Sequence, residues 1–332
     1  MEAEKALERI TPEEAGISSR QVKKCIEELM HETTQMHGFM AARHGKVFAE
    51  CWWAPFNSEM VHSNHSFGKS YTATAIGIAV TEKKLSLDEK MVDIFKDEIE
   101  ERKICVPELT KKITVRHVLS MTNGHAANPS IEGDWIANYF TAAIEYEPGT
   151  RFLYNTSGAC MLAAVVKKKT GENVKDYLTP RLFEKIGINA ERFVWLKWPN
   201  GIDAEPATFA TTEDNLRLTN RLFQKNLSAR HFLSGLRPMR HRNRKTADVG
   251  MDISFGRVVF RVYTGLMVDR DNMESSGLKK NFVLWYMRGE LHHMVHRKRW
   301  MCYMNSCFLW QMMKICHKTE PLMTNLSRMK RA

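Results

Sequence analysis

Hydrophobic and polar positions along the first two-thirds of the chain follow the periods of both strands and helices. Residues 38–43 and 46–52 carry a strand pattern, and His44-Gly45 between them is typical of a tight hairpin turn. An amphipathic pattern predicts a helix from Ser19 to His31. Residues 10–14 hold a Thr, a Pro and two acids, which is typical of an earlier helix start. The N-terminal region is therefore predicted to mix helix and strand.

Further helices are predicted in the middle of the chain. Residues 66–80 have small or apolar side chains on nearly every face, which indicates a buried helix. Shorter helical patterns cover residues 87–90 and 113–119. Residues 161–170 and 174–186 are each followed by Gly, the residue that commonly ends a helix. No internal repeat or low-complexity linker separates these elements.

Length and composition fit one large globular domain or two smaller ones, since 43% of the 332 residues are hydrophobic. No apolar run approaches the roughly 18 residues of a membrane span. The charged N-terminus leads into no apolar run that would predict a secretory signal. Seven cysteines form no paired pattern, and Cys302, Cys307, Cys316 and His317 lack zinc-site spacing. We therefore expect a cytoplasmic protein without disulfides, metal or membrane contact.

The net charge of +11 belongs to the end of the chain. From Leu227 to Ala332 there are 20 Lys and Arg against 7 Asp and Glu, whereas the rest has 29 against 31. Basic runs at residues 240–245 and 296–299 could bind a polyanion, which gives one alternative function. No nucleic-acid-binding motif accompanies them, so nucleic acid is not the expected partner.

Ser66 and Lys69 carry the candidate chemistry. They stand three residues apart at the start of the predicted buried helix, so their side chains share a face. A lysine whose pKa is lowered by burial can accept the serine proton, and a helix N-terminus favours the developing negative charge. The same spacing recurs at Ser276 and Lys279 without a helical setting, so the pair alone is weak evidence.

Several segments together resemble one family in order and spacing: Ser66–Gly77, Leu85–Lys90, Ile113–Gly124, Pro148–Gly158, Thr170-Gly171 and Leu182–Ile188. From about Ile10 to about Lys225 the chain is similar to the β-lactamase-related serine hydrolases, which include class C β-lactamases, D-alanyl-D-alanine carboxypeptidases and esterases. The resemblance implies an α+β fold of three layers, with an antiparallel sheet flanked by helices and a helical region inserted between its halves.

The same resemblance implies a set of site residues. Ser66 would be the acylated nucleophile, Lys69 its base, and Tyr154 the phenol that assists proton transfer. Thr156 stands where the family motif has Asn or Ser, at a substrate-binding position. The implied activity is hydrolysis of a small ester, amide, peptide or β-lactam-like substrate through a covalent acyl-enzyme, without a cofactor. The alternative is a catalytically inactive remnant of such an enzyme, and the sequence predicts no oligomeric state.

The last third departs from the family. Its relatives would continue with strands carrying Gly-Tyr-Gly-Tyr-Gln-Phe-Trp and later Gly-Gln-Tyr-Gly, and neither string occurs. Synonymous codons for residues 250–257 and 270–274, regrouped in one shifted frame, encode Tyr-Gly-Tyr-Gln-Phe-Trp and Gly-Gln-Tyr-Gly. We therefore predict a hydrolase domain over residues 10–225, a frame shift between Asn215 and Leu227, and a non-native segment over residues 226–332.

A frame shift would have two expected consequences. The lost strand would flank the nucleophile and supply a backbone N–H of the oxyanion hole, a donor whose loss typically costs about 10²–10³ in rate. Its loss would also leave an exposed sheet edge.

Overall fold

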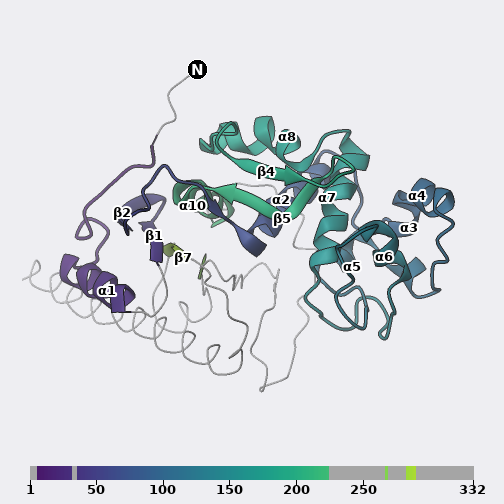
Figure 1. The fold of residues 1–332 in the computed structure, drawn as a ribbon. Helices are drawn as coiled ribbons and strands as arrows, with labels where there is room; N and C mark the ends of the chain where they lie inside the picture. The colour runs from purple at the N-terminus through teal and green to yellow at the C-terminus, as the bar shows by residue number, and fades with distance from the viewer. Residues whose placement is uncertain (1–5, 32–35, 224–265, 268–281, 289–332) are drawn as a thin grey trace, which may run out of the picture.

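The computed structural model describes residues 6–31, 36–223, 266–267 and 282–288. These residues form a mixed arrangement of helices and two antiparallel sheets, as predicted (Figure 1). The basic runs at 240–245 and 296–299, the pair Ser276 and Lys279, and Cys302, Cys307, Cys316 and His317 lie outside the described residues.

The first sheet has the strand order β2-β1-β7-β6. Its predicted hairpin is confirmed: β1 (Met36–Arg43) pairs antiparallel with β2 (Lys46–Trp52). His44 and Gly45 at the turn both have positive φ, 53° and 83°, which matches the twist that a two-residue hairpin needs. Helix α1 (Ser19–His31) has the predicted bounds, and its Cys25 belongs to the same buried apolar cluster as Phe39 of β1.

Beyond β1 lie β7 (Phe282–Arg288) and the short β6 (Leu266–Met267). The expectation of an exposed edge beside β1 is therefore wrong, since β7 pairs with β1 along residues 36–43. The seven residues of β7 read FVLWYMR, and aromatic and β-branched residues of this kind favour strands. The basic segment thus contributes to the sheet at this position.

The second sheet has the order β3-β5-β4, made of β3 (His62–Ser63), β5 (Asp203–Ala210) and β4 (Val194–Lys197). Two central helices pack against β5 and against each other: α2 (Gly68–Thr81) and α7 (Thr156–Thr170). Small side chains such as Ala75 and Ala164 are fully buried there, which permits the close packing. The core therefore lies directly behind the start of α2.

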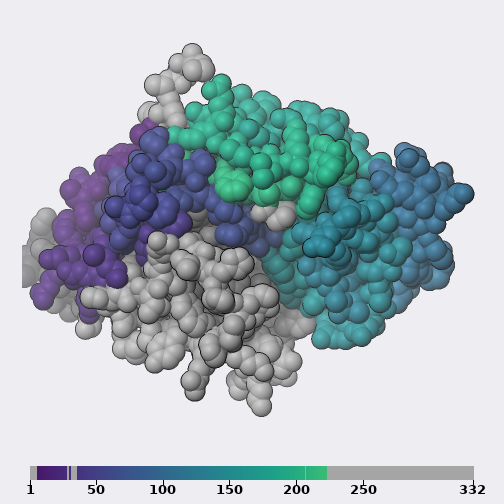
Figure 2. All heavy atoms as spheres, viewed as in Figure 1, coloured from purple at the N-terminus to yellow at the C-terminus, as the bar shows by residue number. Residues whose placement is uncertain are grey.

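The inserted helical region forms one end of the molecule, opposite the first sheet (Figures 1 and 2). Its helices are α3 (Met91–Ile94), α4 (Lys96–Glu101), α5 (Val115–Leu119) and α6 (Trp135–Thr141), with a 3-10 turn at Thr110–Lys112. The predicted helix at residues 87–90 is wrong. The carbonyls of Leu87 and Glu89 instead accept hydrogen bonds from the amides of Arg116 and Val115, and residues 87–88 form a turn.

Two other predicted helices need correction. Residues 10–14 form no helix and enter a turn, because Gly16 takes a left-handed φ of 72° and prevents a helix from continuing into α1. The predicted helix at 174–186 consists of α8 (Val174–Leu178), a π-helical turn (Thr179–Phe183) and α9 (Glu184–Ile186), and it ends at Gly187 as expected. In the described part of the chain, no helix has the length and hydropathy needed to cross a bilayer.

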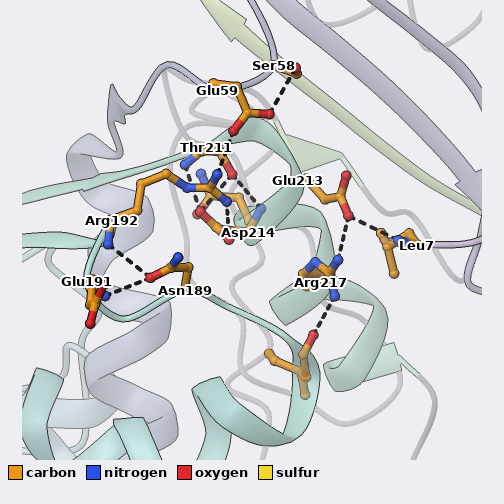
Figure 3. A network of polar contacts seen from close by, with 12 residues as sticks. Leu7, Ser58, Glu59, Asn189, Glu191, Arg192, Thr211, Glu213, Asp214 and Arg217 are labelled. Carbon is orange, nitrogen blue, oxygen red and sulfur yellow. Dashed lines mark hydrogen bonds and ion pairs between the residues drawn. The ribbon is translucent and has the colours of Figure 1, made fainter. Parts of the chain in front are cut away.

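Helix α10 (Thr212–Phe223) follows β5 and packs against β1 and β7. Figure 3 shows the polar network that fixes its start. The amide and hydroxyl of Thr211 donate to one carboxylate oxygen of Asp214, at 3.0 and 2.7 Å, and the Asp214 amide donates back to Thr211 Oγ1. Arg217 pairs with Glu213 at 2.6 Å and donates to the Ile186 carbonyl. These bonds anchor the end of β5 against the body of the protein.

Candidate active site

The candidate nucleophile lies in a loop that is fixed from both sides. Ser66 belongs to the 3-10 turn His65–Phe67, immediately before α2. The fully buried Asn64 donates its amide to the Thr208 carbonyl of β5, and its Oδ1 accepts from Asn215 of α10 at 2.8 Å. Tyr71 of α2 donates its hydroxyl to Asn215 Oδ1 at 3.0 Å. The position of Ser66 is therefore set by β5, α2 and α10 together.

The structure brings Ser66, Lys69 and Tyr154 together. Lys69 Nζ donates to Ser66 Oγ at 3.3 Å, from one turn further along. Tyr154, which precedes α7, donates its hydroxyl to the same oxygen at 2.5 Å. Lys69 is buried, whereas Ser66 and Tyr154 are half-buried.

Thr156 is the first residue of α7 and is half-buried. Within the described residues it makes no hydrogen bond to Ser66, Lys69 or Tyr154. Thr156 therefore lies two residues after Tyr154 in the chain but takes no part in the hydrogen bonds among Ser66, Lys69 and Tyr154.

Asn155 supports Tyr154 from the next position. Its Oδ1 accepts from the Gly158 amide at 2.6 Å and so caps α7, and its Nδ2 lies 3.1 Å from Nδ1 of the buried His125. Burial lowers the pKa of His125 to about 4, so the ring is neutral near pH 7 and Nδ1 can accept the amide proton. The backbone that carries Tyr154 is thus held by a neutral, buried pair.

Glu205 was not predicted as a site residue. It projects from β5, is fully buried, and its Oε2 lies 3.1 Å from Lys69 Nζ. Its only sequence signal is an acidic residue within a mostly apolar strand pattern, and nothing local connects it to Lys69, which lies far away along the chain.

The charge of Lys69 differs from the expectation. Burial alone would lower its pKa, but the nearby Glu205 and Tyr154 outweigh that effect and raise the pKa above its ordinary value. The condition under which the lysine would accept the serine proton, a pKa lowered by burial, is therefore not met in this resting site, because a buried counter-ion opposes the effect of burial. Lys69 is an ammonium group at neutral pH.

Gly68 explains why β5 can approach so closely. A Cβ at this position would lie 2.7 Å from Thr208 Oγ1 and 2.8 Å from the Glu205 carbonyl oxygen. Both distances are shorter than real Cβ contacts allow, and a backbone carbonyl in a strand cannot move aside cheaply. The glycine between Ser66 and Lys69 therefore makes room for the strand that carries Glu205.

Gly68→Ala is expected to destabilise the protein by about 1–3 kcal/mol, the usual cost of overpacking a core. This outweighs the gain of roughly 0.5–1 kcal/mol that Ala normally brings inside a helix. Urea unfolding measures the change. The double variant Gly68→Ala/Thr208→Ala should recover only part of the loss, because the Glu205 carbonyl remains in the way. A single variant as stable as the wild type would contradict this account of the contact.

In the part of the chain that the structure describes, no group of three or more His, Cys, Asp or Glu side chains is arranged to hold a metal ion. The described polar groups that converge at the site are the Ser66 hydroxyl, the Tyr154 phenol, the Lys69 ammonium and the Glu205 carboxylate.

Comparison with known proteins identifies a family and a relative that match this chain. The family model described as Beta-lactamase matches residues 22–266. Penicillin-binding protein 4 of Amycolatopsis lactamdurans is 26% identical over 140 residues, a match that covers 40% of this chain and 36% of that protein.

Solved structures also match part of this chain at low sequence identity. A provisionally named beta-lactamase from Bacteroides dorei DSM 17855 has a TM-score of 0.51 at 15% identity, and the match covers 64% of this chain and 65% of that one. A class C beta-lactamase mutant has a TM-score of 0.48 at 17% identity, over 60% and 62% of the two chains. The match thus spans less than two thirds of the length of each of these proteins.

Proposed function

Since the chain belongs to the Beta-lactamase family of hydrolases, we propose that it is a serine hydrolase that forms a covalent acyl-enzyme on Ser66. One observation carries the proposal: Lys69 Nζ and the Tyr154 hydroxyl converge on Ser66 Oγ at 3.3 and 2.5 Å. A serine hydroxyl needs a positioned proton acceptor to become a nucleophile, and two candidates lie within reach.

The proposed reaction has two steps. Ser66 Oγ attacks the carbonyl carbon of the acyl group while its proton passes to the amine form of Lys69. Tyr154 relays a proton to the departing alcohol or amine, the bond to the leaving group breaks, and the acyl group remains on Ser66 as an ester. A water molecule then attacks this ester with the same groups as proton acceptors, which releases the acid and restores Ser66.

The proposed substrates are small esters, amides, peptides or β-lactam-like acyl compounds. Thr156 begins the helix that directly follows Tyr154, which supports a proposed role in contacting the substrate near the acyl group. The family acts on small molecules, and the proposed acyl transfer includes no cofactor.

The test is covalent labelling of Ser66. Purified full-length protein is incubated with a fluorophosphonate probe and with a fluorescent penicillin, and the labelled peptide is identified by mass spectrometry. We expect the label on Ser66 and its loss in Ser66→Ala. Ser70→Ala, which removes a hydroxyl four residues further along the chain in α2, is the matched control and should still be labelled. Labelling that persists in Ser66→Ala would refute the proposal.

A second candidate, a folded but inactive chain, is favoured by the absence of the Gly-Tyr-Gly-Tyr-Gln-Phe-Trp string from the sequence. That candidate predicts folded protein that neither probe labels. Thermal unfolding measured on the same preparation distinguishes it from a preparation that failed to fold.

A further inference from the structure

The carboxylate of Glu205 has an unusual position for a charged group. Its side chain is completely buried on β5, and Lys69 Nζ lies 3.1 Å away. Within the described residues neither of its oxygens has a hydrogen-bond partner of good geometry, so the Lys69 ammonium is the contact that offsets its charge. A buried carboxylate and a buried ammonium of this kind stabilise each other's charged forms.

The other described groups that face Lys69 are a hydroxyl, a phenol and a thiol. Ser66 of the 3-10 turn accepts a hydrogen bond from Lys69. Tyr154 before α7 donates to the same serine oxygen, and its ring lies 5.3 Å from Lys69 Nζ. Cys160 of α7 lies close enough to interact with Lys69 and Glu205, and burial raises its thiol pKa to about 12, so it is neutral. Among the described residues that face Lys69, Glu205 is therefore the one that carries a carboxylate.

The ion pair has a consequence for the reaction proposed above. An ammonium nitrogen has no lone pair, so Lys69 cannot accept the Ser66 proton until it has lost one of its own. Burial by itself favours the neutral amine, and the adjacent carboxylate opposes it. Residue 205 therefore makes the largest contribution that favours the ammonium form of Lys69.

We propose that Glu205 is a positioning residue that holds Lys69 as an ammonium in the resting site, and so sets the pH above which Ser66 becomes a nucleophile. The inference rests on the proposed function, because it concerns the base of that same reaction. A residue that served packing alone would leave this pH threshold where it is.

The test compares Glu205→Gln with Glu205→Asp and wild type in full-length protein. Acylation of Ser66 by the fluorophosphonate probe is measured across pH. In Glu205→Gln burial dominates and Lys69 rests as the amine, so the acidic limb of the profile moves to lower pH. We expect the ratio of the rate at about pH 6.5 to the rate at about pH 9 to rise roughly tenfold or more, the factor that corresponds to one pH unit. Glu205→Asp keeps the charge and should keep the wild-type midpoint.

A second measurement does not depend on activity. In Ser66→Ala protein with lysine labelled at its ε carbon, the resonance of Lys69, assigned by its loss in Ser66→Ala/Lys69→Met, is titrated with and without Glu205→Gln. We expect the substitution to lower the pH at which this resonance moves. An unchanged titration, or an unchanged midpoint with only a lower plateau rate, would overturn the proposal while leaving Ser66 as nucleophile. Labelling that survives Ser66→Ala would instead overturn the proposed function, and the lysine titration would still decide the role of Glu205.

Discussion

Replacing Lys69 with Met is expected to lower the free energy of unfolding by about 3–5 kcal/mol, because it leaves the Glu205 carboxylate buried without its counter-ion. The same change should lower the rate of Ser66 acylation by about 10²–10⁴, the usual contribution of a general base. Methionine fills a similar volume, so the loss reflects charge and not a cavity. Urea unfolding and probe labelling measure the two effects separately.

The double variant Lys69→Met/Glu205→Gln is the matched control for this result. Replacing both charged partners with neutral groups of similar size removes the uncompensated charge, so most of the lost stability should return. Acylation should not return, because the proton acceptor is still missing. A single Lys69→Met variant that is as stable as wild type at neutral pH would contradict the account of the ion pair.

The stability loss in Lys69→Met should also depend on pH. Burial raises the pKa of Glu205 above its ordinary value, and without Lys69 this shift grows. When folding raises the pKa of a carboxyl group, the protein has its full stability at pH values below the unfolded pKa of that group. The free energy of unfolding then falls as the pH rises through the folded pKa. The deficit relative to wild type should therefore be small in acid and grow toward neutral pH.

Tyr154→Phe is expected to lower the acylation rate by about 10²–10⁴ while leaving stability within roughly 0.5 kcal/mol of wild type. The hydroxyl contacts Ser66 Oγ and lies on a half-buried side chain, so its removal leaves no buried group unpaired beyond the serine itself. Labelling kinetics and thermal unfolding on the same sample measure the two quantities.

Tyr139→Phe provides the control for this change. Tyr139 lies in α6, is fully buried, and its hydroxyl has no hydrogen-bond partner among the described residues. Removing it should leave labelling unchanged and should not destabilise the protein. Equal losses of labelling in both variants would mean that Tyr154 acts through packing and not through its hydroxyl.

Patterns in the sequence predicted those helices, strands and turns that are determined by residues close together in the chain. The hairpin follows from His44-Gly45, and α7 ends where Gly171 takes a left-handed φ. Residues 87–90 misled the prediction because their backbone bonds go to residues 115 and 116 and not along their own helix. Long-range pairing of this kind leaves no periodic signal.

The same distinction applies to the site. Ser66 and Lys69 could be predicted as neighbours because one helical turn separates them, and Tyr154 only through the family motif. Glu205 could not be predicted as a neighbour of Lys69, because it reaches Lys69 only where β5 packs closely against Gly68, which has no side chain. The effect of Glu205 on the Lys69 pKa was missed for the same reason.

Helix α10 bears on where the proposed frame shift begins. Leu216 and Leu218 are fully buried, Asn215 bonds to Asn64 and Tyr71, and Asn220 is still buried. Contacts this specific indicate the original reading frame, so we propose that the shift lies after Asn220. Resequencing the gene across the codons that follow, from DNA and transcript, tests this: an added or missing base upstream of residue 220 would contradict it.

The bond between Asn64 and Asn215 joins residues 151 positions apart in the chain. During synthesis the loop that holds Ser66 therefore leaves the ribosome long before its partner strand and helix exist. The hairpin and α2 can form early from local contacts, but the nucleophile loop must wait for β5 and α10 before it takes its final shape. The order of synthesis makes the loop that holds Ser66 one of the last parts of this half of the protein to be assembled.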